Sequence, residues 1–457
     1  MIPDEFPDWF FTNIHNIEDP SNNRHFPRMA LDWLLSFIDA EDWRARRTVQ
    51  ARALYAAARN QPLDTSGKGR LYESGDRISH ILFQVEAYCD HPHNYEPWSG
   101  SAIIPVFEAI GRRLDSVQDV EGVEARVRRM LTSERSQPDG ALFELLVSSA
   151  YCLNGFAVRF IPEQKGGPRT ADFEAVRDGV AYDVECKRMS TSDFVEKERV
   201  LARSLWRSAA ETLAQLEQST VCTATFHQPL KDVPEDYFLA HMDAWLTDPE
   251  KALVWSDDFA SCVIGTPDLT ELKTVLETDI LMMGSSRFRE LVLGKHYPRS
   301  SFIEIAELKP AYIPRFIEDV GIVIGCRYKS LSEYSMERRA RDIRRQLTKA
   351  FGQLPSDRPS IIHVGFDALE EPEVEAVRAA KIVEAVRTFK APGVQLQWVF
   401  AHHFVPDSPP DAAWIFDETV QSFSFGSASD PPLESAFVMQ TRPENESPFG
   451  HWTKPFD

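Results

Sequence analysis

The chain has 457 residues, of which 43% are hydrophobic and 26% are charged, and its formal net charge is −20. This balance is typical of a globular protein with two or three domains, and the acidic charge argues against broad, charge-driven binding to nucleic acid. The absence of an apolar run of about 18 residues excludes a membrane span. The acidic start MIPDEFPDWFF and six scattered cysteines without a CxxC pair favour a cytoplasmic protein with reduced thiols.

The first part of the chain, residues 1–130, shows helical periodicity. Leu31, Leu34, Leu35 and Ile38 form one apolar stripe at helical spacing. Prolines, glycines and serines separate further segments of the same kind. We therefore expect an all-helical N-terminal domain.

A different pattern begins near Gln137, where helices and strands alternate. Asp139 is a plausible cap for a helix and Gly155 a plausible stop. The expected elements are, in order, a helix at 141–154, strands at 156–161, 171–176 and 180–188, and a long amphipathic helix at 193–217.

The second half of the chain is less regular until its last third. Residues 222–335 mix short strands with helical pieces and are interpreted as an insertion. The expected elements after them are a helix at 336–351, a strand at 360–366, a helix at 373–389 and a strand at 394–405. The alternation predicts one α/β domain over 131–425 with a mixed central sheet flanked by helices. Residues 426–457, rich in Pro, Ser and acid, are expected to form a loose extension.

The segment YDVECKR, residues 182–188, places charged side chains at every second position of a predicted strand. If Asp178 and Gly179 are the central residues of a primed turn, Asp172 lies opposite Glu185 and Glu174 opposite Asp183. Directly opposed Cβ atoms lie about 4.5–5.5 Å apart. Four carboxylates would then share one face, with Lys187 at its edge.

Two interpretations of this hairpin remain open from the residues alone. Opposed like charges destabilise a sheet, and a divalent cation such as Mg²⁺, which prefers oxygen ligands, would offset them. Lys187 would then orient or help to deprotonate a metal-bound water. Alternatively, the charges form the solvated face of a half-buried hairpin and are balanced by nearby Lys and Arg.

The order of these residues resembles the PD-(D/E)xK nuclease superfamily, which has a restriction-endonuclease-like core. The resemblance covers residues 139–218 well and 336–405 loosely. It implies that Asp172 and Glu185 ligate Mg²⁺ or Mn²⁺, that Lys187 assists the attacking water, and that Glu144 of the preceding helix completes the site. It also implies a metal contact through the backbone carbonyl of Cys186. The motif departs from the pattern because Ala171, not proline, precedes the aspartate.

The resemblance implies a metal-dependent nuclease that acts on DNA rather than RNA, with a bacterial defence role by family analogy. The helical domain would bind a protein partner or restrain activity.

A non-catalytic interaction protein that keeps the nuclease-like scaffold is the alternative, and a glycosidase with paired carboxylates is a weaker one, because it leaves the lysine unexplained. Glu144 could also be a helix-start carboxylate favoured by the macrodipole alone. Its apolar neighbours Phe143, Leu145 and Leu146 predict partial burial instead. Asp183 and Glu174 are candidates for supporting positions around the metal.

Other polar residues are candidates for binding or structure. Expected phosphate contacts, if the nuclease interpretation holds, are Lys165, Arg169, Arg188, Arg338, Arg341 and Arg345, although the last three also fit a solvated helix face. The segment CDHPHN at 89–94 fits part of a zinc site or, more simply, a polar turn. His402 and His403, late in an apolar strand, are interpreted as structural histidines.

Overall fold

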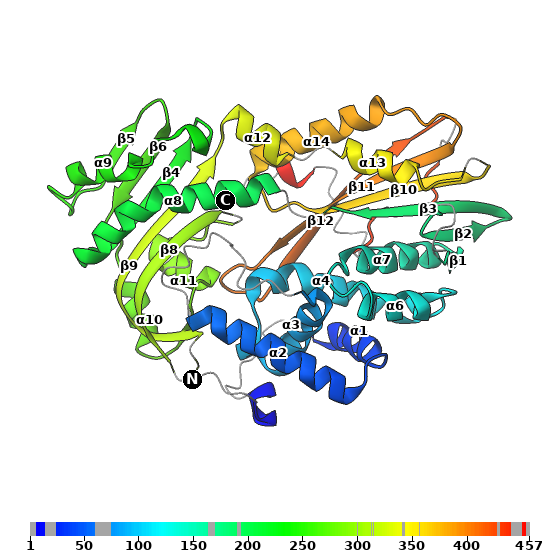
Figure 1. The fold of residues 1–457 in the computed structure, drawn as a ribbon, viewed down its shortest axis with the longest axis horizontal. Coiled ribbons are helices and arrows are strands. Elements are labelled where there is room, and N and C mark those ends of the chain that lie inside the picture. Colours follow the sequence, from blue (N-terminus) through cyan, green and yellow to red (C-terminus); the bar gives the residue numbers. More distant parts are fainter. Residues whose placement is uncertain are drawn as a thin grey trace.

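The computed structural model describes residues 6–13, 24–59, 75–162, 170–189, 193–298, 300–311, 313, 315–340, 343–355, 357–426, 430–439 and 450–453. These residues form an α/β protein with two mixed β-sheets, and the long helix α8 (Asp193–Gln215) runs along the second sheet (Figure 1). None of the helices in these ranges has the length and apolar character needed to cross a membrane.

The first sheet contains the predicted hairpin and has the strand order β1-β2-β3-β10-β11-β12. Its strands are β1 (Ala157–Phe160), β2 (Phe173–Arg177), β3 (Val180–Arg188), β10 (Pro359–Asp367), β11 (Gln395–Asp407) and β12 (Ile415–Ser424). β3, β10 and β11 are parallel, and the other neighbours are antiparallel. The structure thus contains the expected mixed sheet. The elements around the hairpin also follow the expected order, which is a helix, strand β1, the hairpin of β2 and β3, and helix α8.

Helices cover both faces of this sheet. On one face, α7 (Asp139–Leu153) packs against β1 and β3, and Phe173 and Val184 join its buried core. On the other face, α13 (Arg344–Phe351) and α14 (Pro372–Arg387) cover Ile362 and Val364. The sheet is therefore buried on both sides, which is usual where strands are parallel.

One detail of α7 differs from expectation. Asp139 does not cap the helix; its carboxylate accepts two hydrogen bonds from Arg77 at 2.7 and 2.8 Å, because Arg77 at the start of α3 lies within reach. Gly155 ends the helix region as predicted, with φ of 77°, a left-handed conformation that glycine adopts without strain.

The described residues before Thr132 form helices, as expected. These are η1 (Asp8–Phe11), α1 (His25–Leu35), α2 (Ala40–Arg59), α3 (Arg77–Asp90), η2 (Pro92–Asn94), α4 (Pro97–Arg112), α5 (Leu114–Gln118) and α6 (Val123–Leu131). Their apolar side chains, such as Phe83 and Phe107, belong to the same buried cluster as α7 and the hairpin. The core therefore crosses the expected boundary near residue 130, and a separately folding helical domain remains a prediction.

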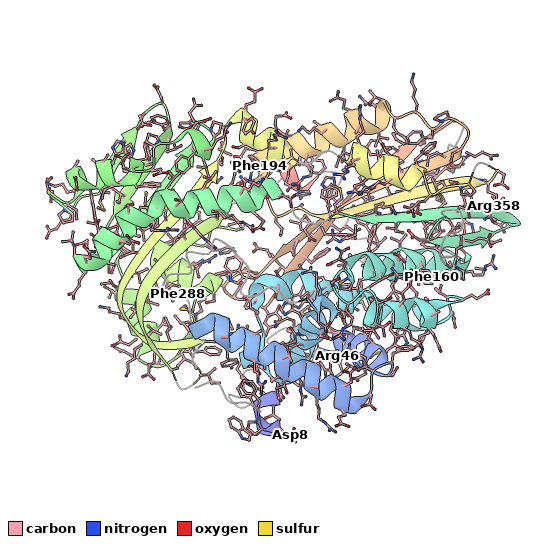
Figure 2. The ribbon with its side chains drawn as sticks, in the orientation of Figure 1. Asp8, Arg46, Phe160, Phe194, Phe288 and Arg358 are labelled. Carbon is pink, nitrogen blue, oxygen red and sulfur yellow. The ribbon has the colours of Figure 1, made fainter. Side chains whose placement is uncertain are left out.

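The second sheet occupies most of the expected insertion and has the strand order β5-β6-β4-β9-β7, with β8 paired to β9. Its strands are β4 (Thr220–Phe226), β5 (Leu253–Ser256), β6 (Ala260–Gly265), β7 (Leu281–Met282), β8 (Ser301–Pro310) and β9 (Phe316–Ser330), and its short helices are η3 (Leu230–Asp232), α9 (Tyr237–Trp245), α10 (Thr270–Leu276) and α11 (Ser286–Leu293). Trp206 of α8 and Phe288 of α11 lie in two buried clusters of this part (Phe288 in Figure 2).

The predicted single helix at 336–351 is wrong. The described residues form α12 (Glu333–Arg339) and, separately, α13. Arg339, at the end of α12, is buried, and its guanidinium lies against three carboxylates, those of Glu198, Glu370 and Glu371. The ion pairs of Arg339 hold the end of α12 in place, and α13 packs on β10 as a separate helix.

The C-terminal residues were expected to be loose, but their described stretches pack against the first sheet. Leu433, Val438 and Met439 are buried. The carboxylate of Glu418 in β12 accepts hydrogen bonds from the backbone N–H groups of Val438 at 3.1 Å and Met439 at 2.8 Å. The short helix η5 (His451–Thr453) lies against β12 and α14. The Pro-, Ser- and acid-rich composition of this segment does not reveal that a few apolar residues anchor it to the sheet.

Candidate functional site

The hairpin of β2 and β3 has the predicted register. Asp178 and Gly179 have φ angles of 53° and 77°, as a primed two-residue turn requires. Arg177 pairs with Val180 and Glu174 with Asp183, which confirms the predicted pairing. The regular ladder ends at Phe173 and Val184, one residue short of the expected pair of Asp172 and Glu185.

Asp172 reaches β3 through its side chain. Its backbone N–H donates to the carbonyl of Val184 at 3.1 Å, and its Oδ2 accepts from the backbone N–H of Cys186 at 2.7 Å. The aspartate is thereby fixed beside Glu185 and Lys187 at the point where the hairpin ladder stops.

Glu185 and Lys187 form an ion pair within β3. Glu185 is fully buried, and its Oε1 accepts from Lys187 Nζ. The other oxygen of the same carboxylate, Oε2, is buried and has no hydrogen-bond partner among the described residues. A buried carboxylate oxygen of this kind costs about 1–3 kcal/mol, so it is a natural place for a ligand.

Glu144 comes to this cluster from α7. It is buried, as its neighbours Phe143 and Leu145 predicted, and Arg126 of α6 donates two hydrogen bonds to it, from Nε at 2.5 Å and Nη2 at 2.8 Å. Arg126 also donates to Glu134 at 2.7 Å. A planar guanidinium in this arrangement fixes a carboxylate in position as well as balancing its charge.

The acids influence one another's protonation. Burial raises the pKa of Asp172 well above its ordinary value, and the carboxylates of Glu144 and Glu185 add to that rise. Burial likewise raises the pKa of Glu185 to about 7, against the opposing effect of Lys187. Burial lowers the pKa of Lys187, but Glu185 and Asp172 raise it by more. The acids therefore tend to keep protons, because Lys187 and Arg126 do not fully balance Asp172, Glu185 and Glu144 when all three are ionised.

The donor set of Asp172 and Glu185 fits a hard divalent cation. Mg²⁺ is commonly held by one or two carboxylates together with water, and the unpartnered Glu185 Oε2 supplies such a donor. Cys186 follows Glu185 in β3 and pairs with His363 in the parallel ladder to β10. Burial raises the pKa of its thiol well above the ordinary value, which disfavours the thiolate form that binds metals. The metal contact expected from its backbone carbonyl stays a prediction.

Glu174 and Asp183 are drawn away from this cluster. Both accept hydrogen bonds from Arg358, which precedes β10 (Figure 2), with Asp183 Oδ1 at 2.7 Å from Nη2. Arg159 of β1 also donates to Glu174 at 3.1 Å. These two carboxylates are therefore balanced by arginines, but Asp183 is buried and its Oδ2 has no hydrogen-bond partner among the described residues, so the pair is not a solvated face. Their role around the metal stays a prediction.

The predicted phosphate contacts are scattered. Lys165, Arg169 and Arg341 lie outside the described residues. Arg188 pairs with Asp367 and stacks on Phe404, and Arg338 stacks on Tyr334, whereas Arg345 of α13 is exposed. Of the described three, Arg345 is the cation most available to a phosphate.

The segment at 89–94 is a buried polar turn. Asn94 Nδ2 contacts the carbonyl of Phe10 at 3.2 Å and the rings of His91 and His93 at 3.1 and 3.0 Å. His402 also has structural contacts, since its ring nitrogens lie 2.9 Å from His363 and 3.1 Å from Glu418. These contacts agree with the simpler interpretation of the turn and of His402.

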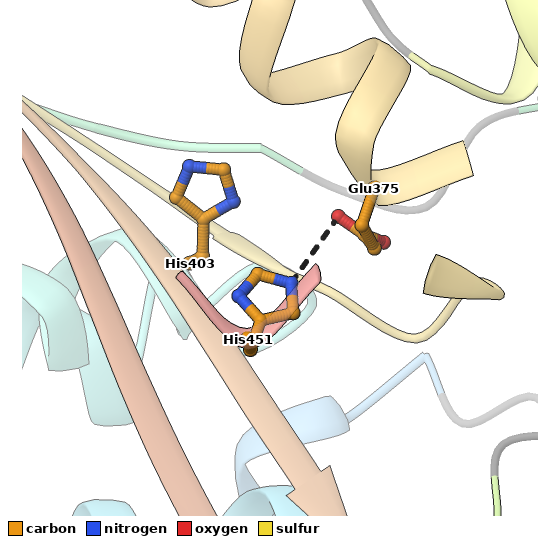
Figure 3. A group of neighbouring side chains, drawn as sticks. All are labelled: Glu375, His403 and His451. Carbon is orange, nitrogen blue, oxygen red and sulfur yellow. Dashed lines mark ion pairs between the residues drawn. The ribbon is translucent and has the colours of Figure 1, made fainter. Parts of the chain in front are cut away.

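A second polar group was missed by the sequence analysis. Within the described ranges, one set of three metal-ligating side chains has its ligand atoms within 4.8 Å of one another, namely Glu375, His403 and His451 (Figure 3). The HH pair in an apolar strand was the available signal, but its partners lie far away in sequence. The acids around Asp172 do not form such a set of three and offer a two-carboxylate site instead.

Comparison of the chain with family models, curated proteins and solved structures found no match.

Proposed function

We propose that the protein is a Mg²⁺-dependent nuclease that hydrolyses phosphodiester bonds, with DNA favoured over RNA. The observation that carries the proposal is the convergence of Asp172, Glu185 and Glu144 beside Lys187 in a buried, under-neutralised cluster. The resemblance of these residues to the PD-(D/E)xK pattern supports the same conclusion. Two further parts of the proposal rest on that resemblance alone. One is a role in bacterial defence, and the other is control of the activity by a protein partner that binds the N-terminal helices.

Asp172 and Glu185 would hold Mg²⁺ or Mn²⁺. When bound, such an ion lowers the pKa of a coordinated water and stabilises charge on the attacked phosphate. Lys187 carries a proton on Nζ and would donate a hydrogen bond to the attacking water or the phosphate from its place beside Glu185. Glu144, fixed by Arg126, would orient the groups around Asp172. The hydrogen bond from the Cys186 N–H keeps the Asp172 carboxylate turned to the site.

The test is incubation of the full chain with plasmid, single-stranded DNA and RNA in Mg²⁺, Mn²⁺ or EDTA. Asp172→Asn should remove the divalent-dependent cleavage, and Lys187→Ala should slow it strongly. Lys251→Ala and Asp248→Asn are matched controls, because these residues form an exposed ion pair in the turn after α9, in the second-sheet part of the chain. Cleavage that persists in both site variants would overturn the proposal.

Two observations favour the alternative of a non-catalytic protein with this scaffold. Arg126 and Lys187 already occupy part of the acidic cluster as ion-pair partners, and the net charge of −20 opposes binding to nucleic acid. In that case neither Mg²⁺ nor Mn²⁺ would bind at Asp172. Calorimetric titration of wild type and Asp172→Asn with Mn²⁺ separates the two functions, because only the nuclease requires a site that the substitution removes.

A further inference from the structure

A second cluster of ligating side chains lies away from the hairpin, where the C-terminal segment meets the first sheet. Glu375 comes from the first turn of α14, His403 from β11 and His451 from η5 (Figure 3). Glu375 and His403 are fully buried and His451 is 2% exposed. Their ligand atoms lie within 4.8 Å of one another, although the residues are separated by up to 76 positions in the chain.

Each of the three side chains presents a buried polar atom with no hydrogen-bond partner among the described residues. These atoms are Glu375 Oε2, His403 Nδ1 and His451 Nε2. Glu375 Oε2 and His451 Nε2 are 3.7 Å apart, too far for a hydrogen bond. An unsatisfied buried polar group destabilises a fold, so three convergent ones indicate a missing ligand.

The remaining polar atom of each side chain is held by a neighbour. Arg378 donates to Glu375 Oε1 at 2.5 Å, His403 Nε2 lies 3.0 Å from Gln421 Oε1, and His451 Nδ1 lies 3.1 Å from Thr419 Oγ1. Metal-ligating histidines commonly use the second ring nitrogen in this way. The contacts leave the three unpartnered atoms facing one another.

The environment of Gln421 fixes the protonation of His403. The Gln421 amide nitrogen donates to the carbonyl of Ala379 at 3.5 Å, so its oxygen faces the histidine. This oxygen can only accept, and His403 Nε2 therefore carries the proton while Nδ1 is left with its lone pair. Thr419 Oγ1 accepts the backbone N–H of His451 at 3.3 Å and is placed to accept from Nδ1 as well.

We propose that Glu375 Oε2, His403 Nδ1 and His451 Nε2 bind a Zn²⁺ ion that fastens the C-terminal segment to α14 and β11. Two imidazole nitrogens and one carboxylate oxygen suit zinc, and a water completes a tetrahedral set. Mg²⁺ is a poor occupant because it prefers oxygen ligands. The site is separate from the acids of the hairpin and does not depend on the proposed nuclease activity.

The test uses the full chain, purified without a histidine tag and stripped with a chelator. Zn²⁺ affinity is measured by competition with a chromophoric chelator, and the visible spectrum is recorded after Co²⁺ substitution. Wild type should bind about one Zn²⁺ per chain and give a tetrahedral Co²⁺ spectrum. His451→Ala should lose both, while the exposed His227→Ala and the hairpin variant Asp172→Asn should retain both.

Substitutions around the ligands keep the proposal testable if His451→Ala does not fold. Gln421→Ala leaves all three ligands in place and should weaken Zn²⁺ binding by about 10- to 100-fold, the usual effect of removing an outer-shell partner. Zn²⁺ should also raise the unfolding temperature of wild type and not that of His451→Ala. The proposal is overturned if wild type binds Zn²⁺ no more tightly than His451→Ala, or if Gln421→Ala binds as tightly as wild type.

Discussion

The carboxylate of Asp172 accepts a hydrogen bond at 2.7 Å from the backbone N–H of Cys186, on the strand that also carries Glu185 and Lys187. This bond holds Asp172 in place. The pKa of Asp172 is raised well above its ordinary value, mainly by burial and further by the carboxylates of Glu144 and Glu185. At neutral pH the ionised form is therefore disfavoured by the fold. Asp172, which anchors the proposed metal site, therefore lowers the stability of the folded protein when no cation is bound.

Asp172→Asn is expected to raise the unfolding temperature in EDTA while it removes cleavage. The amide keeps an acceptor for the Cys186 N–H but carries no charge to repel Glu185 and Glu144. Because a raised folded-state pKa penalises the ionised form above the unfolded value, the gain should be present at pH 7 and vanish at low pH. Thermal unfolding at pH 7 checks this, and a lower unfolding temperature for the variant would contradict it.

Arg126→Ala is expected to lower the free energy of unfolding by about 3–5 kcal/mol, because Glu144 would remain buried without its partner. Urea denaturation measures this change. The double variant Arg126→Met/Glu144→Leu supplies the control, since it removes both charges and should recover much of the loss. Equal stability of the single and double variants would show that the ion pair is not the cause.

Gly179→Ala is expected to destabilise the protein by about 1 kcal/mol, because φ of 77° at this turn position penalises a side chain. Gly179→Asn should cost less, since asparagine tolerates the left-handed region better. Urea denaturation of the two variants tests the turn type. If alanine and asparagine behave alike, the hairpin does not depend on this backbone conformation.

Stability should fall on acidification because of His363. Burial lowers the pKa of His363 well below its ordinary value, and nearby His402 adds to this. The unfolded chain therefore binds a proton below about pH 6.5 that the folded chain rejects, at a cost of about 1.4 kcal/mol per pH unit. Urea denaturation at pH 7.5 and 5.5 should show that wild type loses more stability, or gains less, than His363→Gln over this interval. An equal change in the two proteins would exclude His363 as a source.

Local sequence rules predicted the hairpin well. Asp178 and Gly179 defined the turn, and the turn defined which carboxylates face each other, because register in a two-residue hairpin follows from the turn type. Burial of Glu144 followed from its apolar neighbours in the helix. These features depend on residues close together in the chain.

Contacts between distant residues could not be predicted in the same way. Arg358 neutralises Asp183 across 175 positions, so alternation in β3 alone could not show that Asp183 is paired rather than free. The second sheet pairs β4 with β9, about 100 residues later, and no local pattern shows which distant strand a given strand pairs with. The group of Glu375, His403 and His451 has no motif spacing because three separate elements supply it.

The most direct test of the central claim is the rate of plasmid cleavage by the full chain in Mg²⁺. Wild type should cleave in Mg²⁺ and not in EDTA, and Lys187→Ala should be slower by about 10²- to 10³-fold, the usual cost of removing one hydrogen-bond donor from charge that develops in the transition state. Asp172→Asn should be inactive although it is folded. Unchanged cleavage in both variants, or full cleavage in EDTA, would contradict the assignment of this site.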